Sequence, residues 1–185
     1  MKSTIESMQT INVPINEEES IPLMEAITRL PTLRGSLTLI MDQLDILLQS
    51  ALEQSFQGED EATRYVTAPL LTQESPLHDS LLKARLLVAL GKIDATVFAD
   101  IEHLGHLRQQ LINSPEEVGF TSAVALNALG TLNHFDSMLL QQFEMRLQNV
   151  PEDPDLSAQY LTTVESSIRA ALALSVQTIA QKIAT

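Results

Sequence analysis

The sequence predicts an all-α protein, and three observations support this class. Hydrophobic residues recur at three- and four-residue spacing along most of the 185-residue chain, which is the period of an amphipathic helix. No stretch alternates apolar and polar residues over the length of a strand. Six glycines and 44% hydrophobic residues fit a compact helical protein better than a disordered or fibrous one. We therefore expect a single multi-helix bundle of about seven or eight helices over residues 17–185, after a loose arm at residues 1–16.

Each expected helix has its own start signal or apolar stripe. The acidic run Glu17–Glu19 suits the first turn of a short helix, because carboxylates offset the positive end of the helix dipole. Pro31 suits the first turn of a longer helix, Pro69 ends one, and Asp94 can cap another. Pro151 and Pro154 mark a linker before the last helix. The expected helices span residues 17–29, 31–56, 61–69, 76–90, 94–112, 121–132, 133–147 and 156–184.

The segment from residue 65 to residue 91 contains a turn and a complete helix. Ser75 stands where it can cap this helix, and Pro76 suits its first position. Asp79 lies near the positive end of the dipole and can reach Lys83, four residues on. Gly91 suits the left-handed closing turn. Because this helix is apolar around most of its circumference, we expect residues 76–90 to form the central buried helix.

The same segment carries a motif of fixed spacing, made by Tyr65, Pro69, Leu70, Leu71, Pro76, Leu77, Asp79, Leu90, Gly91 and Ile93. The motif resembles the mannitol operon repressor family, which includes the YggD proteins, and the similarity is firmest from about Arg64 to Ile112. Two positions depart from the family pattern: Ser75 where glycine is frequent and Val88 where tyrosine is common. The resemblance implies an all-helical bacterial regulator of hexitol uptake and metabolism. Most motif positions are expected to be structural, with Asp79, Lys83 and Arg85 as candidates for contact with a partner.

The charge balance argues against direct DNA binding. Eleven basic and 24 acidic residues give a net charge of −13, whereas specific DNA binding draws much of its affinity from Lys and Arg at phosphates. The tightest basic grouping is only Lys83, Arg85 and Lys92. The two helices around Gly91 could be read as a helix-turn-helix, but the second one is acidic until Arg108. We interpret this pair as an ordinary helical hairpin.

One grouping has the residue types of a metal site. Asp100, His103 and His106 lie three residues apart on one face of an expected helix, and Glu102 lies four residues before His106. The grouping lacks the HExxH order of a zinc protease, so surface residues with local acid–His pairing explain it better. Cysteine, a G-x-S-x-G elbow and glycine-rich phosphate loops are absent from the sequence. We therefore expect neither an enzyme nor a bound cofactor.

The N-terminus has no apolar segment of a signal peptide, and no apolar run approaches the roughly 18 residues of a membrane helix. We expect a cytoplasmic protein that represses transcription through another protein, either a DNA-binding regulator or a component of the sugar phosphotransferase system. One alternative is direct DNA binding through a basic patch formed only in the fold or in a dimer. Another is a helical domain that senses a small molecule or metal. The alanine-rich last helix would allow close packing in a homodimer, and packing within one chain explains it equally well.

Overall fold

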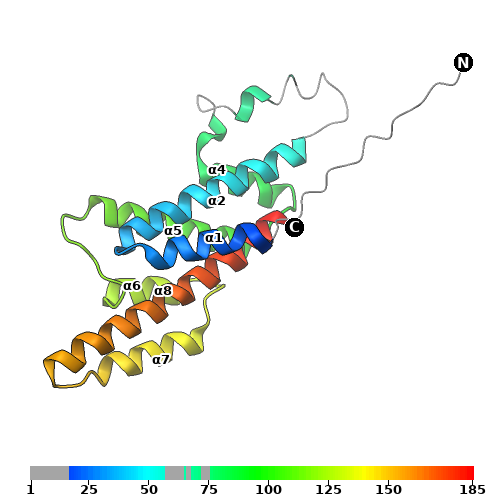
Figure 1. Cartoon of the computed structure of the whole chain (residues 1–185). Helices are drawn as coiled ribbons and strands as arrows, with labels where there is room; N and C mark the ends of the chain where they lie inside the picture. The colour runs from blue at the N-terminus through cyan, green and yellow to red at the C-terminus, as the bar shows by residue number, and fades with distance from the viewer. Residues whose placement is uncertain (1–16, 57–64, 66–67, 72–75) are drawn as a thin grey trace, which may run out of the picture.

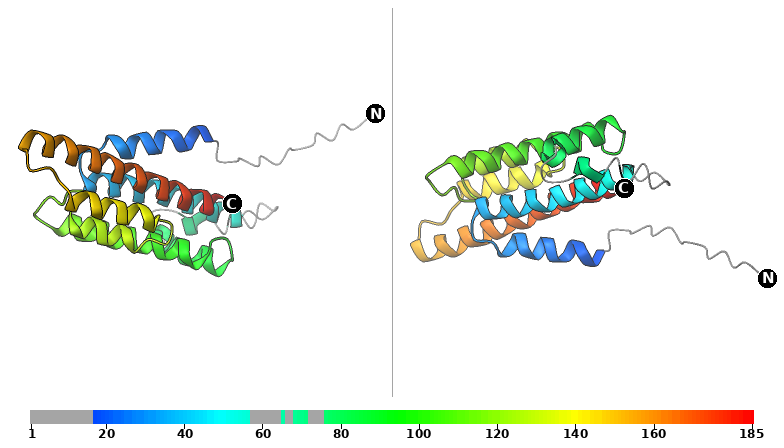
Figure 2. Two further views of the ribbon diagram at one scale, coloured as in Figure 1. Left: turned by 90° about the horizontal axis from the view of Figure 1, so that it is seen from below. Right: turned by 90° about the horizontal axis from the view of Figure 1, so that it is seen from above.

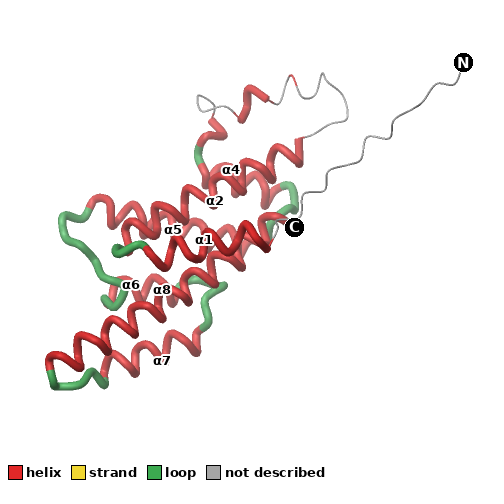
Figure 3. Tube along the Cα trace, in the orientation of Figure 1, coloured by secondary structure: helices red, strands yellow, loops and turns green. Residues whose placement is uncertain are grey.

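The computed structural model describes residues 17–56, 65, 68–71 and 76–185 (Figure 1). The expected arm at residues 1–16, most of the helix expected from about Glu61, and Ser75 lie outside these residues. Seven α-helices and two 3₁₀ turns make up the described chain, which contains no strand (Figure 3). The all-α class is confirmed. The elements are α1 (Glu17–Arg29), α2 (Leu33–Phe56), η1 (Ala68–Leu71), η2 (Pro76–His78), α4 (Ser80–Ala89), α5 (Ala95–Asn113), α6 (Ala123–Gly130), α7 (Ser137–Gln148) and α8 (Pro154–Ala184).

The longest helices, α2 and α8, provide most of the core. Helix α8 packs against α1, α2, α5 and α7, and α2 packs against α4, α5 and α8 (Figure 2). Nine residues of α8 and eight of α2 are buried, so these two helices carry the apolar stripes that the three- and four-residue spacing predicts. Ala171 and Ala173 are buried inside the chain itself, which accounts for part of the alanine-rich face without a second copy.

Helix α4 differs from the expectation that residues 76–90 form the central buried helix. Only Lys83, Ala84 and Leu87 of α4 are buried, whereas Leu82 is 38% exposed and Leu90 is 46% exposed. The expectation was wrong because α4 lies at the edge of the bundle, where α2 and α5 cover one side of it. An apolar circumference therefore does not by itself put a helix at the centre.

The helix ends follow the capping chemistry closely, with shifts of a few residues. Asp79 has extended backbone angles and accepts a hydrogen bond from the Leu82 backbone N–H at 2.8 Å, so α4 begins at Ser80. Pro76 lies in η2 rather than in the first turn of α4, because Asp79 takes over the capping role. Gly91 has φ +69°, which confirms the left-handed turn. The N-caps of the remaining helices with a described cap are Asp94, Ser122, Asp136 and Asp153.

Candidate functional site

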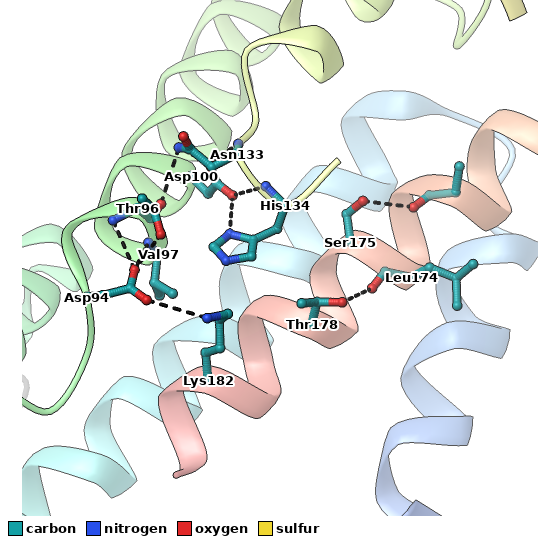
Figure 4. Close-up of polar contacts among 11 residues, drawn as sticks. Asp94, Thr96, Val97, Asp100, Asn133, His134, Leu174, Ser175, Thr178 and Lys182 are labelled. Atoms are coloured by element: carbon teal, nitrogen blue, oxygen red, sulfur yellow. Dashed lines mark hydrogen bonds and ion pairs between the residues drawn. The ribbon is translucent and has the colours of Figure 1, made fainter. Parts of the chain in front are cut away.

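The most extensive polar contact within the core joins α5 to the connection between α6 and α7. Asp100 is fully buried, and its carboxylate accepts hydrogen bonds from two consecutive residues of that connection (Figure 4). The backbone N–H and side-chain amide of Asn133 donate to Oδ1 at 2.7 and 2.8 Å. The backbone N–H of His134 lies 2.9 Å from Oδ2, and its Nδ1 lies 2.7 Å from the same oxygen. Because a carboxylate only accepts hydrogen bonds here, Nδ1 carries the proton.

This arrangement separates the candidate metal ligands. Asp100 points into the core, whereas His103 and His106 are exposed on the outer side of α5. The structure therefore brings Asp100 together with His134 and not with the two histidines next to it in sequence. Among the residues the structure describes, no group of three or more His, Asp or Glu side chains is arranged to hold a metal ion.

The three candidate contact residues of the motif occupy different environments. Lys83 is 4% exposed, and its ammonium lies 2.8 and 3.0 Å from the two carboxylate oxygens of Asp45 on α2. Ser80 donates to the same carboxylate at 2.6 Å, so this cluster fixes α4 to α2. Lys83 is thus held by Asp45 within the fold, and a structural role fits it better than the expected contact with a partner. The sequence did not predict this pairing because Asp45 lies 38 residues earlier in the chain.

Asp79 and Arg85 are exposed, and both already have local roles. Asp79 caps α4. Arg85 lies 3.4 Å from the carboxylate of Glu102 and 5.6 Å from the centre of the Phe98 ring. Arg85 therefore joins the outer faces of α4 and α5 through a surface ion pair and a cation–π contact, each of which contributes little when exposed.

The other motif positions divide into a turn and an exposed segment. Gly91 serves the left-handed turn, and the described part of the chain leaves Tyr65 82% exposed. Pro69 and Leu70 in η1 are also exposed, and Leu77 in η2 is half-buried. Leu71 and Pro76 lie in the 3₁₀ turns η1 and η2. A structural role therefore fits Gly91 and Leu77 directly, and it stays a prediction for the rest.

A groove opens between α2 and α4, beside the Lys83–Asp45 pair. It has a volume of about 430 Å³. Five of its residues come from α2, one from η2 and one from α4: Asp45, Ile46, Gln49, Ser50, Glu53, His78 and Lys83. Glu53 accepts a hydrogen bond from the Gln49 amide at 2.9 Å, and no cation contacts it within the described chain. The groove is therefore acidic and partly apolar.

Most basic side chains in the described chain are held by the protein's own acceptors. Of the eleven basic residues, Lys2 and Arg64 lie outside the described part, which leaves nine. Five of the nine form ion pairs, namely Arg29–Glu25, Lys83–Asp45, Arg85–Glu102, Arg169–Glu165 and Lys182–Asp94. Arg34 donates to the carbonyl oxygens of Ser114 and Glu116 at 2.9 and 3.4 Å. These contacts leave no continuous row of unpaired cations on the described surface.

The remaining three basic residues do not share a surface. Lys92 lies in the turn before α5, and Arg108 lies on α5 itself. Arg108 lies 13 residues after the first residue of α5, which corresponds to about 20 Å of helix beyond the turn that contains Lys92. Arg146 belongs to α7. A basic strip of the kind that follows a DNA backbone is therefore not formed by these residues.

No helix in the part of the chain that the structure describes is long and apolar enough to span a membrane.

The fold and these surfaces define an acidic, all-helical bundle whose buried charges serve packing. The chain belongs to the mannitol repressor family, whose model matches residues 18–184. It is 27% identical over 162 residues to the mannitol operon repressor of Escherichia coli strain K12, which covers 87% of this chain and 80% of that protein. The expected resemblance to this family is confirmed.

Solved structures show the same fold. The structure described as the MtlR–HPr complex from Escherichia coli superposes with a TM-score of 0.77 and 25% identity, covering 90% of this chain and 98% of that chain. The structure of a possible transcriptional regulator, YggD, from Shigella flexneri 2a gives a TM-score of 0.75 with 22% identity, over 89% of this chain and 96% of that one. A shorter similarity joins the chain to fumarase E of Shigella flexneri, at 33% identity over 76 residues, or 41% of this chain and 45% of that protein.

Proposed function

We propose that this protein represses a mannitol operon through contact with another protein and not by binding operator DNA itself. Membership of the mannitol repressor family supports the regulatory role. The observation that favours an indirect mechanism is the charge distribution. The net charge is −13, and five of the nine described basic residues lie in ion pairs with carboxylates of the same chain. A DNA-binding surface needs cations that are free to meet phosphates.

The partner we propose is a phosphotransferase-system protein of the HPr kind, which would place both proteins in the cytoplasm. The similar Escherichia coli protein has been solved in a complex with HPr, and the superposition covers 98% of the chain in that structure. An acidic bundle suits such a contact, because complementary charge speeds the encounter and orients the partner. Repression would then respond to sugar uptake through the fraction of the protein that is bound.

Isothermal titration calorimetry of the full chain with HPr from the same organism tests this proposal. We expect saturable binding with one HPr per chain and an affinity that decreases with salt, as for charge-assisted contacts. A reporter fused to the mannitol-operon control region tests the second half of the proposal: deleting the gene should raise expression. Heat changes equal to those of dilution, together with unchanged reporter expression, would refute both halves.

The similarity to fumarase E calls for an enzymatic control. It covers 41% of this chain and 45% of that protein. We expect the purified protein to leave fumarate unhydrated in a spectrophotometric assay. Turnover that scales with protein concentration and survives repurification would contradict this expectation.

A further inference from the structure

The groove between α2 and α4 has a wall that already binds an ammonium group. Two oxygens of Asp45 hold the Lys83 ammonium at 2.8 and 3.0 Å, and Ser80 completes this contact at 2.6 Å. Because Lys83 balances the charge of Asp45, Asp45 serves the packing of α4 on α2 and is not available to a second cation. Any further cation that enters the groove must be held by another acceptor.

Glu53 provides that acceptor. It lies two turns along α2 from Asp45 and lines the same groove. Its one described partner is the neutral amide of Gln49 at 2.9 Å, so its negative charge is not balanced by a cation there. A carboxylate with a neutral donor keeps capacity for a charge-assisted hydrogen bond.

Ile46 gives the groove an apolar surface next to these carboxylates. It lines the groove and is 59% exposed. Long basic side chains lay their aliphatic stems along apolar surface while the charged end finds an acceptor. Along this face of α2, the apolar side chain of Ile46 can contact such a stem, and the carboxylate of Glu53 can accept from its charged end.

We propose that the groove between α2 and α4 is a docking site for a protein partner that inserts a lysine or arginine side chain, with the stem on Ile46 and the charged end on Glu53. The volume of about 430 Å³ accommodates such a side chain together with part of the backbone that carries it. The proposal rests on the proposed function, because it assigns a surface to protein-mediated repression. It does not require that HPr is the partner that uses this groove.

Nuclear magnetic resonance on the full chain tests the chemistry of the groove. The probe is Nα-acetyl-lysine methylamide, and its neutral counterpart is Nα-acetyl-norleucine methylamide. We expect the lysine probe to shift the amide signals of Ile46, Gln49 and Glu53 in a saturable way, and the norleucine probe to leave them in place. Glu53→Lys should abolish these shifts, and Glu53→Gln is the isosteric variant should the lysine disturb α2. Glu144→Lys is the matched control, because Glu144 is an exposed carboxylate on α7, away from the groove.

A repression assay tests whether a partner uses the groove. We expect Glu53→Lys to lose repression of the mannitol-operon reporter and Glu144→Lys to keep it. Signals that do not move, shifts that Glu144→Lys removes equally, or full repression by Glu53→Lys would each overturn the groove proposal. These outcomes are distinct from failure of the proposed function. That failure would appear with the wild-type chain, as absent HPr binding and as reporter expression that does not change when the gene is deleted.

Discussion

Replacing Asp100 by alanine would remove the carboxylate that accepts hydrogen bonds from four donor groups. The carboxylate is fully buried, and its contacts with Asn133 and His134 are 2.7 to 2.9 Å long. Two of the donors are backbone N–H groups in a short connection, so they cannot turn away to find water. A buried donor left without a partner costs about 1–3 kcal/mol, whereas the exposed Asn133 side chain can be hydrated. We therefore expect a loss of about 3 kcal/mol in the free energy of unfolding.

For a chain of this size, a loss of that magnitude lowers Tm by roughly 6–12 °C. Circular dichroism during thermal and urea unfolding measures both quantities. Glu102→Gln is the control, because Glu102 is also a carboxylate on α5 but forms only the surface pair with Arg85 at 3.4 Å. We expect that change to alter stability by less than about 1 kcal/mol. Equal stability of Asp100→Ala and wild type, or equal effects of the two substitutions, would refute the role given to Asp100.

Three further predictions concern single residues. Asp45→Asn leaves the buried Lys83 ammonium without its carboxylate, so it should lower the free energy of unfolding in urea by about 3 kcal/mol. Lys83→Met removes the buried charge and should cost less. Equal losses for the two variants would contradict the burial of a charged Lys83. Gly91→Ala should cost about 1 kcal/mol by the same measurement, since φ is +69° and no neighbouring atom adds a clash; an unchanged midpoint would be the contrary result. The hydroxyl of Thr96 and then the Val97 backbone N–H hold the pKa of Asp94 well below its usual range. A lowered pKa adds stability above the unfolded value of about 3.9, so Asp94→Ala should differ from wild type at pH 6 and converge with it as the pH falls below about 4; a constant difference across this range would contradict the lowered pKa.

The local chemistry of the chain predicted most of the helices. Apolar spacing located α2, α5 and α8, because each has one long stripe against the core. Asp94 as a cap and Gly91 as a left-handed turn were also predicted correctly, since both depend on neighbours within a few residues. The predicted start of α4 is too early because Ser75 followed by Pro76 has the sequence signature of a helix start, whereas Asp79 is the N-cap in the structure.

Contacts between distant residues were not predictable in this way. The sequence groups Asp100 with the nearby His103 and His106, whereas the fold pairs it with His134, 34 residues later. The sequence makes Lys83 a candidate for contact with a partner, because it does not show that Asp45 lies across from it. The neighbouring residues in sequence do not indicate either pair. A carboxylate on a helix is expected to be exposed unless the packing of the other helices shows otherwise. A signal that could have found Asp100 is its place among Val97, Ile101 and Leu104 on the buried stripe of α5.

The central claim of the proposed function is that this protein represses transcription without binding operator DNA itself. Fluorescence anisotropy of a labelled mannitol-operon control fragment, titrated with the purified chain at about 50 mM and about 200 mM salt, tests this claim most directly, because phosphate contacts weaken strongly over this range. We predict no preference for this fragment over scrambled DNA at either salt concentration. Tight binding that prefers the control fragment and weakens steeply with salt would contradict the claim and make the protein a direct repressor.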